Sequence, residues 1–489
     1  MSAEFRFAFG PFELDPAAKR LFRDGEPVAM SARHVELLCA LVAKAGQIVT
    51  KDQLIQVGWG DIAVTDNSLE QIISSLRRVL DDPGGRQYIE TQARRGYRFI
   101  AAVTRHERRE TDAALDALLA PHRAWMEGRA ALETLERTHI TRARQVFEDV
   151  LTVAPAQASA HVGLANACIM QFEMTRADQR PDADALQKAA AHAREACRLD
   201  AGYGEAWATL GFVLERTGQH GDALAALRRA VTLEPDNWRH HVRLSYCSWG
   251  EERLRAARRA LSLLPGFPMA HWLAATVYIA RQAYAEAERE VAAGVAAMLQ
   301  QAHAQTQFSA VALHWLTGLL ALSRGDEDEA LAAFARELND EASGQLYSRE
   351  CCANTWYAIG AVHLRRGRFA DAVHAFTQAR ERIPAHLLAA RGLLESSKGL
   401  GLTMPSDGPA ALIAAATAHA SGFDAALVRA ADLVLGGRRE EAARTIDTAL
   451  ADAPPGSAGW LLPVEPLLFV QSAADVWASP LGRLRARAV

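Results

Sequence analysis

The chain has 489 residues, of which 50 % are hydrophobic and 23 % charged, and its formal net charge is −4. With only 33 glycines and 18 prolines, this composition excludes a collagen-like, low-complexity or wholly disordered chain. The charge excludes a global basic field, so any contact with nucleic acid or an anionic membrane must come from a local patch.

The first segment reads as a small antiparallel sheet. Phe5, Phe7 and Phe9 alternate with polar or small residues, which is the period of a strand with one buried face. Further strand signals occur at Phe12 to Leu14 and at Leu21-Phe22, separated by turn dipeptides. We therefore expect two or more short strands before the first helix.

Three helices are expected next. Ser31 opens an apolar 3.6-residue pattern that ends at Gly46, and Thr50 with Gln53 forms the capping-box pattern of a second helix. The third helix, Asn67 to Leu80, carries its leucines and isoleucines on one stripe and polar side chains on the opposite one. Asn67, three residues before Glu70, fits a helix cap and a base-reading side chain equally well.

A hairpin follows, from Tyr88 to Val103, with arginines at its tip. Six arginines and three acidic residues lie between Arg77 and Arg98, so basic charge gathers on the third helix and this hairpin. A sheet, three helices and a hairpin are the order of a winged helix. An α-helix fits the DNA major groove, while the hairpin reaches the neighbouring backbone or minor groove.

The residues themselves resemble a known family. The segments TKDQLIQVGW, NSLEQIISSLRRVLDD and YIETQARRGYRF are similar to the winged-helix output domain of OmpR/PhoB-type regulators, in the CadC/ToxR/HilA-like branch. The resemblance covers about the first 103 residues. It implies that the third helix enters the major groove and that the wing contacts the minor groove. Two departures from the family are expected: no receiver domain precedes this domain, and no transmembrane helix follows it.

The resemblance also implies a set of DNA-binding residues on the third helix and the wing. These are Asn67, Gln71, Ser74, Ser75, Arg77, Arg78, Thr91, Arg94 and Arg95. Ser74 and Ser75 stand where family members often have basic side chains, which makes cooperative binding as a homodimer more necessary. The segment Gly60 to Asp66 corresponds to a loop that some members use to contact RNA polymerase, so polymerase is a candidate partner.

The rest of the chain repeats with a period of 34 residues. Aligning residues 204–237 with 353–386 matches Trp207 with Trp356, Gly211 with Gly360 and Pro235 with Pro384. This is the tetratricopeptide pattern, and about eight to ten copies fit between residues ~120 and ~460. In that family the first helix of each pair lines a concave surface. Carried onto the two clear copies, the lining positions are Glu205, Phe212, Glu215, Arg216, Asn354, Tyr357 and Arg365. They are candidates for contact with a protein or small-molecule partner, or for packing against neighbouring repeats.

The sequence shows no phosphate-binding loop, no zinc-protease motif and no nucleophile elbow, so we expect no enzyme, no cofactor and no metal site. The six cysteines lack CxxC spacing, and none of the apolar stretches reaches the ~20 residues of a membrane-spanning helix. We therefore expect a cytoplasmic protein without disulfides, and the adjacent Cys351 and Cys352 as a redox pair are the alternative.

Together these features predict an N-terminal α+β winged helix joined to an all-α tetratricopeptide-repeat solenoid. The expected divisions are a DNA-binding domain at 1–104, a linker at 105–118 and a repeat array at 119–489. The predicted function is a one-component bacterial transcription regulator that binds double-stranded DNA, with repeats for sensing and self-association. The alternative is a repeat-based scaffold whose winged helix does not bind DNA specifically.

Overall fold

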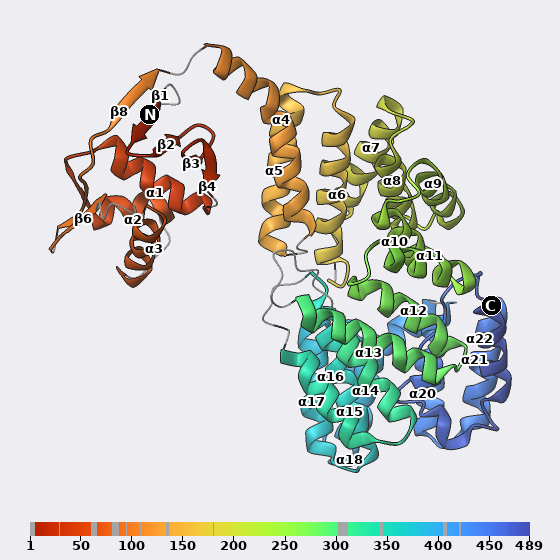
Figure 1. Cartoon of the computed structure of the whole chain (residues 1–489). Helices are drawn as coiled ribbons and strands as arrows, with labels where there is room; N and C mark the ends of the chain where they lie inside the picture. Colours follow the sequence, from red (N-terminus) through yellow and green to blue (C-terminus); the bar gives the residue numbers. More distant parts are fainter. Residues whose placement is uncertain are drawn as a thin grey trace. The chain divides into compact units, whose positions relative to one another are not determined.

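The computed structural model describes residues 5–28, 30–59, 66–80, 88–93, 95–107, 110–133, 136–178, 180–301, 312–339, 341, 346–403, 408–419 and 422–489. The chain forms two compact units, Met1–Pro121 and His122–Val489 (Figure 1). The first combines strands and helices and the second is helical, as the sequence predicts.

The first unit opens with an antiparallel sheet of order β4-β3-β2-β1-β8. Phe7 of β1 pairs with Leu14 of β2, which pairs with Leu21 of β3. All three side chains are buried, so the alternating pattern is confirmed. The strands are β1 (Phe5–Phe9), β2 (Phe12–Asp15), β3 (Arg20–Arg23), β4 (Glu26–Val28) and β8 (Thr104–Glu107).

Strand β8 lies where the sequence predicts the start of a linker. Arg105 pairs with Phe7 in the sheet, and its guanidinium lies 5.0 Å from the centre of the Phe5 ring and 5.5 Å from that of Phe7. A charged side chain that covers aromatic rings stabilises an edge strand. The linker prediction rested on the charge of this segment alone and therefore did not include the strand. Helix α4 (Glu110–Glu133) occupies most of the remaining predicted linker.

Three helices pack on this sheet. In α1 (Ala32–Ala43) the Ser31 side chain accepts a bond from the His34 backbone N–H, as expected of a cap. At the start of α2 (Lys51–Trp59), the Thr50 N–H donates to Gln53 Oε1 and the Gln53 N–H donates to Thr50 Oγ1, both at 3.3 Å. The predicted capping box is therefore confirmed. The third helix is α3 (Asp66–Val79).

A second sheet carries the wing. Its strands are β5 (Ile48–Thr50), β6 (Ile89–Gln92) and β7 (Gly96–Phe99), in the order β5-β7-β6. Gly96 has φ +142°, and a Cβ there would lie 2.1 Å from the Val49 carbonyl oxygen. Only glycine lets β5 approach the wing this closely. Phe99 then packs edge-on against Phe9, with ring centres 4.9 Å apart, which joins the two sheets in one core.

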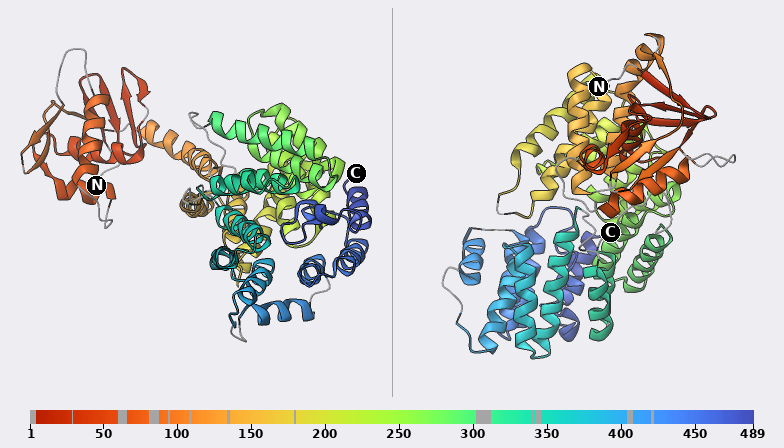
Figure 2. Two further views of the ribbon diagram at one scale, coloured as in Figure 1. Left: turned by 90° about the horizontal axis from the view of Figure 1, so that it is seen from below. Right: turned by 90° about the vertical axis from the view of Figure 1, so that its left-hand side faces the viewer.

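The second unit is a succession of helix pairs (Figure 2). The first helices of successive pairs also contact one another, for example α6 with α8 and α14 with α16. The helices are α5 (Arg137–Val153), α6 (Ala158–Thr175), α7 (Ala183–Leu199), α8 (Gly204–Arg216), α9 (His220–Leu233), α10 (Trp238–Cys247), α11 (Gly250–Leu263), α12 (Pro268–Ala280), α13 (Tyr284–Gln301), α14 (Leu313–Ser323), α15 (Glu327–Asn339), α16 (Ser348–Arg365), α17 (Phe369–Arg382), α18 (Leu387–Gly399), α19 (Pro409–His419), α20 (Phe423–Leu435) and α21 (Arg439–Asp452). None of the helices in the described part of the chain is long and apolar enough to span a membrane.

Small residues set the spacing within the pairs. A Cβ at Gly211 would lie 2.6 Å from the Leu227 side chain, and one at Gly360 would lie 2.7 Å from Phe376. Phe376 also fills the space beside Gly392 of the next pair, where a Cβ would come within 2.3 Å. The 34-residue frame thus corresponds to a repeated fit of a large side chain against a bare backbone.

Residues 453–489, the C-terminal segment, depart from the helix-pair pattern. They contain two short 3-10 helices, η2 (Leu462–Val464) and η3 (Val470–Ala473), and the helix α22 (Ala478–Arg487). Helix η2 contacts α12 and α14, and α22 contacts α12 and α21. Trp477 in this segment is fully buried. The segment therefore packs against α21 and also against α12 and α14, the first helices of earlier pairs.

Candidate nucleic-acid interface

Helix α3, which the sequence predicts to be the recognition helix, is strongly amphipathic. Leu69, Ile73 and Leu76 of α3 are at most 1 % exposed and belong to the core of the first unit. Gln71 and Ser74 are exposed on the helix and Ser75 is half-buried. Because the apolar stripe anchors α3, its polar side chains are held at fixed positions on the surface.

Glu70 on the same helix has a partner within the domain. Lys51 Nζ, at the start of α2, lies 3.0 Å from Glu70 Oε1, and both side chains remain accessible to solvent. A carboxylate on a DNA-facing surface would repel phosphate, and this ion pair offsets that charge.

Arg77 joins the recognition helix to the wing. Its Nε and Nη2 donate to the Ile89 carbonyl oxygen at 3.1 and 3.0 Å, and Nη2 also donates to Thr91 Oγ1 at 2.7 Å. The family resemblance implies that Arg77 and Thr91 contact DNA. In the structure their bond fixes the position of β6 relative to α3. No local sequence signal indicates this contact, because it depends on how the hairpin folds back.

One arginine of the wing is ion-paired with an acidic side chain of the wing, and another is exposed. Arg98 Nε donates to Glu90 Oε2 at 2.9 Å, and this bond lowers the pKa of the Glu90 carboxyl. Arg95 is exposed at the turn, where its backbone N–H donates to the Gln92 carbonyl at 3.0 Å. Arg78, on the last turn of α3, is exposed as well. Among the described arginines of this region, Arg98 is thus paired with an acidic side chain, whereas Arg78 and Arg95 are exposed.

Some expected site residues lie outside the described residues. These are Arg94 at the wing tip and positions 60–65 of the loop that the resemblance connects with RNA polymerase. Asn67 lies in the first turn of α3, which begins at Asp66, and the structure describes its backbone only.

Comparison with known proteins agrees with this geometry. Residues 25–99 match the family model described as "Transcriptional regulatory protein, C terminal". Residues 25–99 are an OmpR/PhoB-type domain. The model for a tetratricopeptide repeat matches residues 204–247, which hold α8, α9 and α10. The domain order expected from the sequence is therefore confirmed.

The relatives of the OmpR/PhoB-type domain are transcription regulators. The transcriptional regulator HilA of Salmonella typhimurium is 36 % identical over 98 residues, which is 20 % of this chain and 18 % of HilA. The transcriptional activator CadC of Escherichia coli is 29 % identical over 96 residues, 19 % of each chain. The chain thus spans about a fifth of the length of these curated relatives. A solved DNA-binding domain of E. coli CadC aligns over its full length and 22 % of this chain, at 26 % identity and TM-score 0.20.

In the repeats, the candidate partner-binding residues of α8 contact their neighbours. Glu205 accepts bonds from Arg129 at 3.2 Å and from the Tyr203 hydroxyl at 3.1 Å. Arg216 pairs with Glu173 at 2.5 Å and donates to the Tyr246 hydroxyl at 2.8 Å. The remaining two behave likewise: Phe212 packs edge-on against Tyr246, and Glu215 lies 2.8 Å from a ring nitrogen of His220.

The candidate residues of α16 contact the C-terminal segment or its surroundings. The Tyr357 hydroxyl donates to Glu465, and Arg365 Nη1 donates to the Pro466 carbonyl at 3.3 Å. The Arg365 guanidinium also lies 4.2 Å from the centre of the Phe469 ring. The third residue, Asn354, is hydrogen-bonded through its Oδ1 to His386 Nε2 at 3.2 Å. Sequence reasoning did not predict that the C-terminal segment contacts these positions, although the apolar run from Trp460 onward indicates a buried segment.

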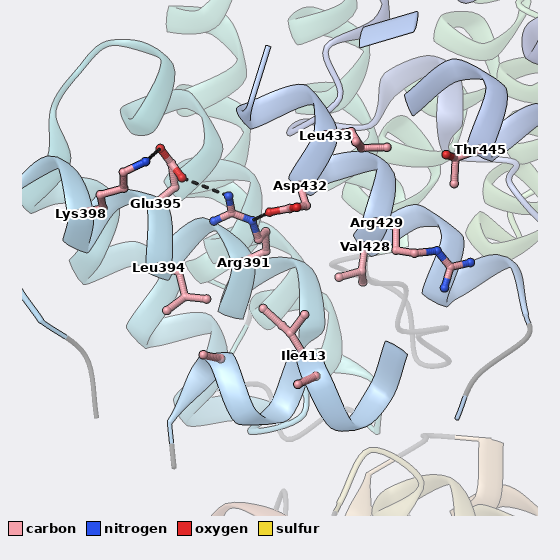
Figure 3. A pocket seen from close by; sticks show the side chains of 12 residues that line it. Arg391, Leu394, Glu395, Lys398, Ile413, Val428, Arg429, Asp432, Leu433 and Thr445 are labelled. Carbon is pink, nitrogen blue, oxygen red and sulfur yellow. Dashed lines mark hydrogen bonds and ion pairs between the residues drawn. The ribbon is translucent and has the colours of Figure 1, made fainter. Parts of the chain in front are cut away.

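A separate pocket of about 640 Å³ lies among α18, α19, α20 and α21 (Figure 3). Arg391 reaches across it from α18 and pairs with Asp432 at 2.8 Å and with Glu395 at 3.0 Å. Apolar side chains, among them Leu394 and Ile413, form the neighbouring wall. Because its central charges neutralise one another, this pocket offers a bound molecule mainly apolar contact.

The adjacent Cys351 and Cys352 lie near the start of α16. All six cysteines are free thiols. Burial raises the pKa of the Cys351 thiol well above its ordinary value, which disfavours the reactive thiolate. Within the described residues, no group of three or more His, Cys, Asp or Glu side chains is placed to hold a metal ion.

Proposed function

We propose that the protein is a one-component bacterial transcription regulator that works in the cytoplasm. The observation that carries the proposal is the exposed polar face of α3 beside a wing with an exposed arginine. A helix of this kind fits the DNA major groove, and the adjacent wing reaches the backbone. The matching family and the regulators HilA and CadC support the same assignment.

The contacts divide into two groups by their chemistry. Gln71, Ser74 and Ser75 hold donors and acceptors on the exposed side of α3, so we assign them to base edges or nearby backbone. Arg78 and Arg95 are assigned to phosphates, with Arg94 at the same wing tip. Arg77 and Thr91 hold the wing in place, and Asn67 lies at the end of α3 that would enter the groove first.

Control of this DNA-binding domain is assigned to the repeats. An array of helix pairs offers extended surfaces to a protein or a small molecule, and such surfaces also suit self-association. Ser74 and Ser75, which stand in place of basic side chains, lower the expected affinity for DNA. Binding as a homodimer would make up for that loss. The segment 60–66 stays a candidate contact for RNA polymerase.

Binding of the full chain to DNA upstream of its own gene tests the proposal. Replacing Arg78 and Arg95 by Ala should weaken binding to every sequence and flatten the dependence of log K on log salt by about 0.9 per lost phosphate contact. The matched control is Arg20→Ala, which removes an exposed arginine from β3, on the other sheet. Fluorescence anisotropy at several salt concentrations measures both quantities. An unchanged slope in the double variant contradicts the phosphate assignment.

The second candidate function is a repeat-based interaction scaffold whose winged helix does not bind DNA specifically. The ion pair of Arg98 with Glu90 favours it, because that pair offsets one positive charge on the surface offered to DNA. The two functions differ in competition experiments. A regulator releases its own upstream DNA only to specific competitor, whereas a scaffold releases any DNA equally to non-specific competitor.

A further inference from the structure

A cavity of about 600 Å³ lies between the repeats and the C-terminal segment. One wall comes from α14, α16, α18 and α20, and the other from residues 457–466. Trp315, Phe423 and Trp460 supply aromatic surface, and the Trp315 and Trp460 rings meet edge-on with centres 6.5 Å apart. We call this space the C-terminal cavity. Its volume and largely apolar lining are those of a site for a small organic molecule.

The polar groups of the C-terminal cavity are biased toward negative charge. Its described lining includes the carboxyl groups of Asp424 and Glu465 and contains no lysine or arginine. This is notable in a chain where 54 residues are lysine or arginine. His386 also lines the cavity, and burial lowers its pKa to about 4, so its ring is neutral at pH 7. The charge of the lining therefore favours a cationic molecule.

Glu465 is the group that most requires a partner. Its side chain belongs to a residue only 4 % exposed, and Oε1 accepts the Tyr357 hydroxyl and, at 3.2 Å, the Leu467 backbone N–H. Among the described residues, the structure gives Oε2 no hydrogen-bond donor. Burial raises the pKa of this carboxyl to about 7. A largely buried carboxylate with donors to only one of its two oxygens is costly, and a bound cation would offset that cost.

We propose that the C-terminal cavity binds a small organic ammonium compound with an apolar body. The ammonium group donates to the free oxygen of Glu465, and charge-assisted bonds of this kind are among the stronger ones in proteins. The aromatic rings accept the remaining positive charge on their faces, and the leucines of α14, α18 and α20 contact the apolar body.

Binding in this cavity would couple two parts of the second unit. The molecule touches first helices of the array on one side and the C-terminal segment on the other, so it stabilises their contact by its binding free energy. The role of this ligand as the small-molecule signal of the regulator rests on the proposed function. Its binding to the cavity does not.

Isothermal titration calorimetry of the full chain at pH 8, where the Glu465 carboxyl is ionised, tests the proposal with molecules that differ in charge. The probes are 2-phenylethylammonium, the uncharged 2-phenylethanol and the anionic 3-phenylpropionate, with hexylammonium as a second amine. We expect both amines to bind, the alcohol to bind about tenfold more weakly or worse, and the carboxylate not to bind.

Variants locate the site. Glu465→Gln keeps the shape of the side chain and should weaken binding of 2-phenylethylammonium about tenfold or more. The matched control is Glu440→Gln, an exposed glutamate of α21 outside the cavity, which should leave affinity unchanged. Circular dichroism checks that each variant is folded. If Glu465→Gln does not fold, Asp424→Asn, which alters an exposed lining residue, should still weaken amine binding.

Equal affinity of the folded wild-type chain for amine, alcohol and carboxylate overturns the proposal, and so does the absence of binding of either amine at millimolar concentration. Unchanged amine affinity in folded Glu465→Gln overturns it as well. DNA binding measured on the same preparation keeps the two hypotheses apart. A chain that binds DNA and no amine refutes the cavity site alone, and one that binds amine without DNA refutes the regulator alone.

Discussion

The two units use their polar side chains in opposite ways. In the first unit, the polar face of α3 is turned to solvent, and the internal bonds of Arg77 and Arg98 hold the wing beside it. In the second unit, Tyr357 and Arg365, where a partner would be expected on the repeats, contact the C-terminal segment of the same chain. The side chains expected at a binding surface are therefore open to solvent in the first unit and in contact with the chain's own C-terminal segment in the second.

The largest expected effect tests whether the repeats depend on their packed interior. Phe376→Ala removes a fully buried ring that fills the space beside Gly360 and Gly392. We expect the free energy of unfolding of the second unit to fall by about 3–5 kcal/mol. Chemical denaturation followed by circular dichroism measures the loss. The stability of the first unit should stay unchanged, and its loss together with repeat stability would contradict the division into two compact units.

A pH series sharpens the comparison at the buried acid. Burial raises the pKa of Glu465 from 4.5 to about 7, so the folded protein holds this proton more tightly than the unfolded chain. The associated stability is fully present below about pH 4.5. It is lost as the pH rises to about 7 and changes little above that, for a total of about 3 kcal/mol. Glu465→Gln cannot titrate and should lack this loss.

Urea unfolding of the wild type and of Glu465→Gln at pH 5, 6, 7 and 8 measures this difference. Exposed Glu440 provides the control, because Glu440→Gln should follow the wild type at every pH. Parallel curves for the wild type and Glu465→Gln would mean that the carboxyl is solvated in the folded protein.

The smallest expected effect concerns the link between α3 and the wing. Arg77→Ala leaves the Ile89 carbonyl without its donor and should destabilise the first unit by about 1–3 kcal/mol. Exposed Arg78→Ala should cost less than about 0.5 kcal/mol in stability, although it weakens DNA binding. Thermal unfolding and DNA titration of the two variants separate a positioning arginine from a contacting one. Equal stabilities of the Arg77→Ala and Arg78→Ala variants would contradict this difference between the two arginines.

Much of the fold could be predicted because its signals are local. Thr50 and Gln53 are three residues apart, and the match of Gly211 with Gly360 follows from one repeat frame. The contacts that were missed join distant positions: Arg77 bonds Ile89 over 12 residues, and Tyr357 bonds Glu465 over 108 residues. Arg105 was expected in a solvated linker but lies in β8. A charged side chain indicates a solvated segment only when no aromatic ring is near enough for it to cover. Hydrophobic period predicts which elements form, and tertiary packing decides which of their faces stay open.

The placement of the C-terminal segment bears on how the protein is made. Trp315 on α14 and Tyr357 on α16 leave the ribosome more than a hundred residues before Trp460 and Glu465, which cover them. During that interval the nascent array holds an aromatic surface without its cover, in the state most prone to aggregate and to engage chaperones. Translation that stops before Trp460 would leave the surface exposed permanently. Covering of this aromatic surface therefore depends on residues that are synthesised well after it.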